Sequence, residues 1–355
     1  MARLTTDKIS LAGVCCALPG EGHNIFDIGR PYFDEETIRK TTSPIGVETL
    51  FRAPDDMTAS DICYKAADRL IDGLGWERGE IGALIFITQT PDYRMPATSC
   101  ILADRLGLPE GCVTFDINLG CSAFVNGYFL AANLIAAGSC DKALLLIGDT
   151  LREYVSPEDK GLTFIISDGG SATAFERSSE SRPTSFLMKS DGSGYGNLII
   201  PAGASRMPSD SGTCVPTDDG SGSRRSEDDM YMDGMGVFTF AVKQVPLLIG
   251  ELAECHGISK DAVDLYLFHQ ANAYMLKYIA KRAGVPMDKV MININKYGNT
   301  NGSTIPFLLA DLSSELSLGG SGGKEIMMAG FGVGLSWGGV CMNFGGMDFA
   351  EIINV

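Results

Sequence analysis

The sequence has few histidines and tryptophans and comparatively few basic residues. Its 355 residues include three His and two Trp, and 28 Lys and Arg stand against 44 Asp and Glu, for a net charge of −16. A surplus of negative charge disfavours a broad nucleic-acid-binding surface. The cysteines show none of the paired motifs that hold zinc, so no metal site is predicted.

Long apolar runs are also missing. No run reaches the roughly 18 residues that would predict a membrane span, and the opening residues MARLTTDKIS lack the apolar core of a signal peptide. The ten cysteines are scattered, which is typical of a reduced cytosolic protein. We therefore expect a cytoplasmic protein, and its 45% hydrophobic content is enough for a large core.

The most informative segment is residues 113–138. A short β-type run, Val113 to Ile117, is followed by a tight turn, then by Cys121 and a long apolar segment that ends at Gly138. This pattern predicts a strand, a turn and a buried helix with the cysteine at its N-terminus. Free N–H groups at that position favour a thiolate, so Cys121 is a candidate nucleophile for a carbonyl carbon. The alternative is a cysteine that packs as a small hydrophobic residue.

Two further segments carry candidate polar groups. His269 follows an apolar run that predicts a strand and precedes a predicted helix at about 272–282. Sites in α/β proteins are often built where a strand gives way to a helix, although a hydrogen-bonded core histidine would fit the same pattern. We expect His23 and His256 at the surface. The Gly- and Asn-rich segment 294–306 contains Asn299, one candidate donor among several, and a plain loop could have this composition.

Together, Cys121, His269 and Asn299 resemble the Cys-His-Asn set of the thiolase-fold condensing enzymes, and most closely the β-ketoacyl-acyl-carrier-protein synthase III family. The motifs DINLGCSAF, LFHQAN, KYGNT and AGFGVGLSWG occur in the order of that family. The resemblance covers residues from about 8 to 344. Four ordered motifs are far more specific than any one of them.

The resemblance implies an acyltransferase that needs no cofactor. Cys121 would take an acyl group from a coenzyme A or phosphopantetheine thioester, and the backbone N–H groups of Cys121 and Val333 would form the oxyanion hole. His269 and Asn299 would stabilise the enolate formed when a malonyl-thioester loses carbon dioxide. Attack of this enolate on the acyl-cysteine would give a β-ketoacyl product.

Further roles are implied by position in the family motifs. Three residues match the pantetheine tunnel, one matches a residue that reaches across a homodimer into the partner's acyl pocket, and two match basic positions that meet an acidic carrier protein. They are, in that order, Gly234, Phe238 and Asn272; Met95; and Lys281 and Arg282. Ordinary core packing, or a solvated helix face for the basic pair, would explain the same residue types.

The sequence also departs from the family. Its initiating enzymes carry a Trp and an Arg near residues 40–44 that enclose the adenine of coenzyme A, and IRKTTSPIGVETLF has neither in register. Tyr274 stands where an Arg is usual, and Thr239 where a Lys is usual. These differences weaken the case for acetyl-coenzyme A priming. The sequence does not determine the acyl chain length, or whether coenzyme A or a carrier protein delivers the acyl group. It also leaves open whether the enzyme initiates fatty-acid synthesis or acts in a specialised pathway.

Two other functions remain possible at this stage. One retains the acyl-cysteine but transfers its acyl group to an oxygen or nitrogen acceptor without decarboxylation. The other is a non-catalytic, interaction-only homologue, against which the intact Cys-His-Asn set argues.

The order of predicted elements indicates an internal duplication. Strand–helix–strand–helix–strand occurs twice, with 290–295 taken as a strand of the second half and 305–316 as a helix. This matches an α/β, thiolase-like fold of two similar halves in α/β/α/β/α layers, divided into residues 1–182 and 183–355. The segment 203–229, rich in Gly, Ser, Asp and Pro, interrupts the second half. We expect it to form a surface excursion at the mouth of the site.

Overall fold

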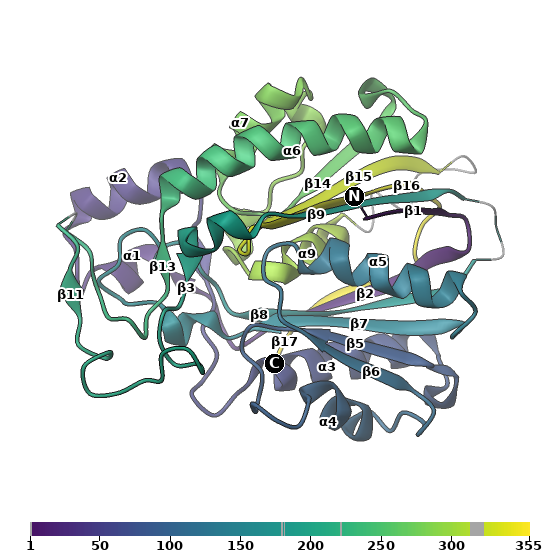
Figure 1. Ribbon diagram of the computed structural model, residues 1–355, viewed down its shortest axis with the longest axis horizontal. Helices are drawn as coiled ribbons and strands as arrows, with labels where there is room; N and C mark the ends of the chain where they lie inside the picture. The colour runs from purple at the N-terminus through teal and green to yellow at the C-terminus, as the bar shows by residue number, and fades with distance from the viewer. Residues whose placement is uncertain (1, 179, 181, 221, 313–322) are drawn as a thin grey trace.

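Two stacked β-sheets form the centre of the protein, with helices between them and on both outer faces (Figure 1). The structure is a computed structural model of the full chain and describes all residues except 1, 179, 181, 221 and 313–322. The layers therefore follow the order α/β/α/β/α, as expected for a thiolase-like fold.

The two sheets contain six and five strands. In spatial order the larger sheet consists of β17 (Phe349–Asn354), β2 (Ile9–Leu18), β8 (Gly169–Arg177), β7 (Lys142–Asp149), β5 (Ala83–Ile87) and β6 (Val113–Ile117). The smaller one consists of β1 (Ala2–Thr6), β9 (Thr184–Ser190), β16 (Ser336–Phe344), β15 (Lys324–Gly332) and β14 (Leu265–Phe268). Three short pairs lie outside them: β3 (His23–Asn24) with β4 (Thr49–Leu50), β10 (Leu198–Ile199) with β13 (Tyr231–Met232), and β11 (Thr217–Asp218) with β12 (Arg224–Arg225).

The helices are divided among three layers and one side of the molecule (Figure 1). In the outer layers lie α3 (Ala59–Leu74) and α4 (Thr98–Arg105) on the larger sheet, and α6 (Gly234–His256) and α7 (Ala273–Ala283) on the smaller. Between the sheets lie α5 (Ala123–Ala136) and α9 (Thr304–Asp311), and elsewhere α1 (Ile25–Gly29), α2 (Glu35–Ile45) and α8 (Ile294–Tyr297). The 3₁₀ turns are η1 (Arg78–Glu80), η2 (Leu151–Tyr154), η3 (Gly192–Asn197), η4 (Lys260–Ala262), η5 (Met287–Lys289) and η6 (Asn301–Ser303).

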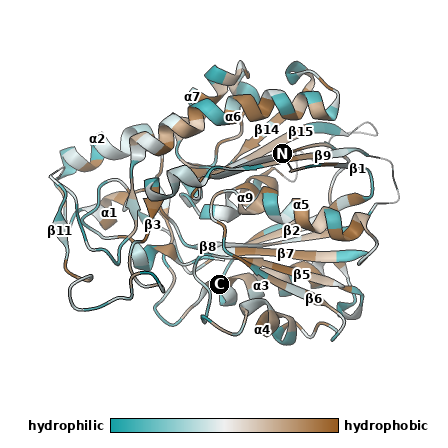
Figure 2. Cartoon of the chain, viewed as in Figure 1, coloured by the Kyte–Doolittle hydropathy of each residue, from teal (hydrophilic) through white to brown (hydrophobic). Residues whose placement is uncertain are grey.

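The hydrophobic pattern explains why these elements form. The parallel strands β5 and β7 are buried along almost their whole length because helices or strands cover both faces, so they are continuous apolar runs (Figure 2). The middle helix α5 is apolar on most sides because it contacts both sheets. At the start of α3, the Thr58 side chain accepts from the backbone N–H of Asp61, and the Asp61 carboxylate accepts from that of Thr58.

The two halves exchange their terminal strands. The first strand, β1, pairs with β9 in the sheet of the second half, whereas the last, β17, pairs with β2 in the sheet of the first half. A division near residue 182 lies between β8 and β9, which belong to different sheets. A division there assigns β1 to the first half and β17 to the second, although each strand belongs to the sheet of the other half. No single cut in the chain therefore separates the two sheets.

Some expectations about local structure were wrong. Residues 290–295 do not form a strand: Val290 makes one isolated bridge to Tyr266, and the chain then turns into α8. Helix α9 covers Thr304–Asp311, and the end of the predicted helix at 305–316 lies outside the described residues. The segment 203–229 is an excursion as predicted, and it contains the β11–β12 hairpin.

One helix among the described residues, α6, is long and apolar enough to cross a membrane by length and composition. Its apolar residues pack on β9, β15, β16 and α7, as in the core helix of a globular protein.

Candidate active site

The turn that carries Cys121 is shaped by close backbone packing. The cysteine lies two residues before the start of α5. A Cβ on Gly332 of β15 would lie 2.7 Å from the Cys121 Cβ and 2.8 Å from its Sγ, and a Cβ on Gly120 would lie 2.5 Å from the Gln89 Oε1. A side chain at Gly332 would therefore press directly on the nucleophile, so a glycine at this position allows the Gly-rich motif 329–338 to approach Cys121 closely.

Burial decides the protonation state of Cys121. Desolvation raises the pKa of its thiol to about 11. Hydrogen bonds from the backbone of Val333 and of Cys121 itself lower the pKa, but by less than burial raises it. The prediction of a thiolate at a helix N-terminus was therefore wrong for the resting enzyme, because burial outweighs the helix terminus. The backbone groups expected to form the oxyanion hole, those of Cys121 and Val333, both approach the sulfur.

His269 begins the segment after β14, where its backbone N–H donates to the carbonyl of Ala329 at 2.8 Å. Its Nδ1 lies 2.8 Å from the Thr304 Oγ1, and its ring meets Phe331 edge-on with centroids 5.7 Å apart. Burial lowers the pKa of the imidazole to about 3, so the ring is neutral at physiological pH. With Nδ1 engaged, Nε2 is the ring nitrogen left for a substrate.

Asn299 is held by both its backbone and its side chain. Its N–H donates to the carbonyl of Ile165 at 2.9 Å, and its carbonyl accepts from the N–H of Ser167 at 3.0 Å. Its Oδ1 accepts from the backbone N–H of Asn301 at 2.9 Å. With the oxygen occupied in this way, the Nδ2 donors are left for a ligand.

The structure brings the three predicted residues together. Cys121, His269 and Asn299, far apart in the sequence, line one cavity of about 690 Å³. Apolar residues dominate the walls, among them Ile166, Met230, Leu198 and Phe331. A cavity of this size and character suits a small acyl group attached to a long, mostly neutral arm.

A polar network beside the nucleophile was not predicted from the sequence. The Cys121 thiol donates to the Asn301 Oδ1 at 3.4 Å, and the Asn301 Nδ2 donates to the Asp149 Oδ2 at 2.6 Å and to the Gln89 Oε1 at 3.1 Å. Asp149 ends the buried strand β7, and burial raises the pKa of its carboxyl to about 7. An acidic residue at the end of an apolar strand was the one available signal for this group.

Of the other predicted binding residues, Gly234, Phe238 and Asn272 line the same cavity. The Asn272 Oδ1 also accepts from the N–H of Met275 at 2.7 Å and so caps α7. Met95 does not line the cavity in the single chain, and it is 83% exposed.

Three aromatic rings pack together beside the cavity. One of them, Tyr274, stands at the position where the family usually has an Arg. The rings of Tyr274 and Tyr278 are 4.7 Å apart between centroids, and the ring of Phe238 lies 5.8 and 5.5 Å from them. On nearby α2, Arg39 and Lys40 pair with glutamates one turn earlier on the same helix, at 2.6 Å each.

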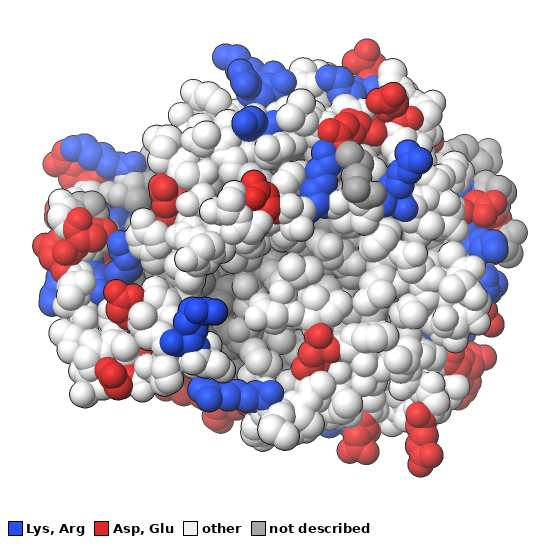
Figure 3. Space-filling view, viewed as in Figure 1, with Lys and Arg blue, Asp and Glu red and all other residues white. Residues whose placement is uncertain are grey.

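Lys281 and Arg282 are exposed in the last turn of α7. Basic side chains gather over this helix at one edge of the face shown in Figure 3, and the centre of that face is hollowed. Basic residues also stabilise a helix C-terminus through the helix dipole, so this position has a purely structural explanation as well.

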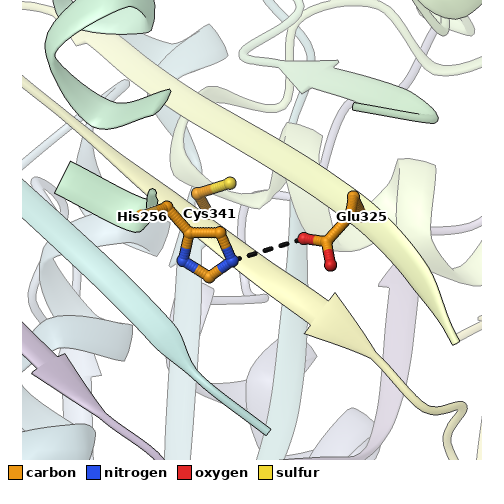
Figure 4. Close-up of side chains that lie close together, drawn as sticks. All are labelled: His256, Glu325 and Cys341. Atoms are coloured by element: carbon orange, nitrogen blue, oxygen red, sulfur yellow. Dashed lines mark ion pairs between the residues drawn. The ribbon is translucent and has the colours of Figure 1, made fainter. Parts of the chain in front are cut away.

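A second group of titratable side chains lies away from the cavity (Figure 4). Among the described residues, His256, Glu325 and Cys341 are the one such group whose atoms are close enough for a metal ion. The His256 Nε2 pairs with the Glu325 carboxylate at 3.3 Å, and its Nδ1 is 3.0 Å from the Ser185 Oγ. The expectation of a surface His256 was wrong, because its side chain is 2% exposed. These partners join the end of α6 to the smaller sheet.

Comparisons with known proteins agree with this geometry. Two family models match, "3-Oxoacyl-[acyl-carrier-protein (ACP)] synthase III" over residues 115–192 and its C-terminal counterpart over residues 253–344. A putative 3-oxoacyl-[acyl-carrier-protein] synthase 3 of Campylobacter jejuni is 33% identical over 95% of this chain and 94% of its own length. A β-ketoacyl-[acyl-carrier-protein] synthase III of Clostridium perfringens is 34% identical over 86% of this chain and 89% of its own.

The chain belongs to the β-ketoacyl-acyl-carrier-protein synthase III family. The crystal structure of a 3-oxoacyl-(acyl-carrier protein) synthase from Burkholderia xenovorans superposes with a TM-score of 0.92 at 36% identity, covering 100% of this chain and 99% of that one. A synthase III structure from Pseudomonas aeruginosa gives 0.79 at 26% identity, covering 95% and 98%. The chain is an acyltransferase of this family, whose reaction is a decarboxylative condensation that gives a β-ketoacyl product.

Proposed function

We propose that Cys121, His269 and Asn299 carry out this condensation, with the sulfur as the acyl carrier and the two nitrogen donors as the decarboxylation pair. The observation that carries the proposal is their convergence on a single cavity, with the backbone of Val333 against the sulfur. The convergence also argues against an interaction-only homologue, because such a protein has no need of it.

In the first half-reaction the Cys121 sulfur attacks the carbonyl carbon of an acyl-thioester. The negative charge that develops on the carbonyl oxygen is held by the backbone N–H groups of Cys121 and Val333, and one such donor is worth about 3–4 kcal/mol in a transition state. The bond to the pantetheine sulfur then breaks, and the proton released by the buried thiol ends on that leaving sulfur.

In the second half-reaction a malonyl-thioester loses carbon dioxide, and its thioester oxygen becomes an enolate. The Asn299 Nδ2 and the His269 Nε2 donate to this oxygen. The neutral ring suits this role in the tautomer with its proton on Nε2, for which the Thr304 hydroxyl turns its one proton from the Asn301 carbonyl to Nδ1. The enolate carbon attacks the acyl-Cys121 carbonyl, the carbon–sulfur bond to Cys121 breaks, and the β-ketoacyl-thioester is released. The Cys121 thiolate then takes a proton from water, which restores the resting thiol.

The substrates are an acyl-coenzyme A or acyl-carrier protein and a malonyl-carrier protein. The pantetheine arm passes Gly234, Phe238 and Asn272, and the acidic carrier docks on Lys281 and Arg282. Because Tyr274, which packs against Phe238 and Tyr278, stands where the family usually has an Arg, the donor site of this chain favours the neutral arm over the nucleotide.

The active protein is a cytoplasmic homodimer in this proposal, and Met95 closes the partner's acyl pocket. Its exposed position outside its own cavity supports this role. All ten cysteines are free, as suits a reducing compartment.

Intact-protein mass spectrometry with a panel of acyl-coenzyme A and acyl-carrier-protein donors tests the proposal, with Cys121→Ala as control. We expect an acyl-sized mass gain that the control lacks, followed by carbon dioxide release that depends on malonyl-carrier protein. Acylation without malonyl-dependent carbon dioxide would instead favour transfer to an oxygen or nitrogen acceptor. No adduct from any donor would overturn the proposal.

A further inference from the structure

Asn301 contacts all three residues of the proposed active site through three different groups. Its side-chain Oδ1 accepts from the Cys121 thiol at 3.4 Å, and its backbone N–H donates to the Asn299 Oδ1 at 2.9 Å. Its backbone also forms a hydrogen bond with the His269 ring, and its carbonyl accepts from the Thr304 hydroxyl at 3.2 Å. Asn301 is 3% exposed, so these contacts do not compete with water.

The side chain of Asn301 is held from behind. Its Nδ2 donates to the Asp149 Oδ2 at 2.6 Å and to the Gln89 Oε1 at 3.1 Å, so both sides of the amide are occupied. Two acceptors behind the amide fix its orientation, because a flipped amide would set its oxygen against the oxygens of Asp149 and Gln89. The Oδ1 is thereby directed at the sulfur.

The backbone of this residue is unusual as well. Asn301 has φ of 52° and is the one described residue other than glycine with a positive φ. Asparagine is among the few non-glycine residues that adopt this conformation readily. The conformation directs the backbone N–H toward Asn299, while the side chain reaches Cys121.

We propose that Asn301 is a positioning residue, which orients the Cys121 thiol through its side chain and the Asn299–His269 pair through its backbone. It ties the nucleophile of the first half-reaction to the donors of the second in one fixed arrangement. This inference rests on the proposed function of those three residues and adds a residue to it.

Three substitutions separate the two parts of this role. Asn301→Gly removes the side chain but adopts φ of 52° without strain, so the backbone contacts persist. Asn301→Ala removes the same side chain and strains the backbone. Ser303→Ala, on the same η6 turn, is the matched control: it removes a buried hydrogen bond to the Ile147 carbonyl at 2.8 Å without touching the catalytic residues.

The first readout compares two reactions of Cys121 at one pH, acylation by an acyl-thioester and alkylation by iodoacetamide. Their ratio cancels the thiolate fraction and reports how well the sulfur is oriented. We expect the ratio to fall at least about tenfold in Asn301→Gly, and to stay within about twofold of the parent in Ser303→Ala. An unchanged ratio in Asn301→Gly would overturn the side-chain role.

The pH dependence of alkylation is a readout that a merely structural residue would not move. The titratable groups facing Cys121 are Asp149 from β7 and His269, which is neutral. A carbonyl that accepts from the thiol stabilises its protonated form, so Asn301→Gly shifts alkylation to lower pH. Asn301→Asp adds a carboxylate beside the sulfur and shifts it to higher pH. Shifts of the same sign in both variants would contradict the assignment.

The rate of carbon dioxide release from a malonyl-thioester tests the role of the Asn301 backbone separately from that of its side chain. We expect Asn301→Gly to retain it within about threefold and Asn301→Ala to lose about tenfold or more. Equal losses in the two variants, with melting temperatures close to that of Ser303→Ala, would overturn the backbone role. If the parent enzyme itself failed to acylate Cys121, the proposed function would fail before these variants were compared.

Discussion

A single methyl group added at Gly332 should disable Cys121 without unfolding the protein. The new Cβ would lie 2.7 Å from the Cys121 Cβ and 2.8 Å from its Sγ, whereas ordinary contacts begin near 3.4 Å. One partner must therefore move by roughly 0.7 Å. Misplacing a reacting atom by about 1 Å can cost about 100-fold in rate. We expect Gly332→Ala to slow acylation of Cys121 by about that factor.

A matched control separates the loss of geometry from the loss of stability. A Cβ on Gly339, on the neighbouring strand β16, would lie 2.8 Å from the Leu252 Cδ2 and 3.0 Å from the Met328 carbonyl oxygen, away from the cavity. Overpacking at either site costs about 1–3 kcal/mol of the free energy of unfolding. Gly339→Ala should therefore lower the melting temperature similarly and leave acylation of the folded enzyme within about twofold.

The assay is time-resolved intact-mass measurement of the acyl-enzyme at a temperature where circular dichroism shows both variants folded. Acylation of Gly332→Ala at the parent rate would refute the reasoning, because the sulfur would then tolerate displacement. Equal slowing in both variants would show that the effect is global.

Five further results are expected. Asn299→Ala should slow malonyl-thioester decarboxylation by about 100-fold or more while acylation stays within about threefold, measured by carbon dioxide release beside intact mass; equal losses would contradict the separate roles. With the pKa of His269 lowered to about 3, decarboxylation should show no limb near pH 6.5 in a rate profile from pH 5.5 to 8. The unfolded chain binds this proton first, so His269 contributes a loss of stability as pH falls from about 6.5 toward 3, which His269→Gln should remove in denaturant titrations. Tyr274→Arg should lower KM for an acyl-coenzyme A severalfold and leave KM for the matching acyl-pantetheine unchanged. Lys281→Glu with Arg282→Glu should raise KM for a carrier-protein thioester and leave KM for the other donors unchanged. Steady-state kinetics measure both, and equal changes for all donors would contradict these roles.

Much of the fold could be read from the sequence because its periodic segments are strong. Strand β6 has the predicted bounds, Val113–Ile117, and helix α7, Ala273–Ala283, lies within a residue of the predicted 272–282, because a β-type run and a helical apolar period define these segments. The run 290–295 was misread because alternating apolar residues also suit a covered loop that enters a short helix. The exchange of terminal strands could not be predicted, because pairing between distant segments leaves no local pattern.

The candidate site was recovered in part for the same reason. Cys121, His269 and Asn299 stand in motifs that resemble a known family, and the cavity brings them together. Asn301 could not be distinguished from the neighbouring asparagines in the sequence, because the residues that its side chain contacts lie 152 and 180 positions away in the chain. The charge state of Cys121 was misjudged because the helix terminus can be predicted locally, whereas burial requires the whole fold.

The exchanged terminal strands have a consequence for how the protein is made. The larger sheet obtains its edge strand β17 from residues 349–354, which are synthesised long after its other strands, all of which end by Arg177. Until then β2 presents an open edge, of the kind that invites pairing with other chains. The first half is therefore an incomplete folding unit during synthesis, and a product that stops before Phe349 should aggregate rather than persist as a stable half.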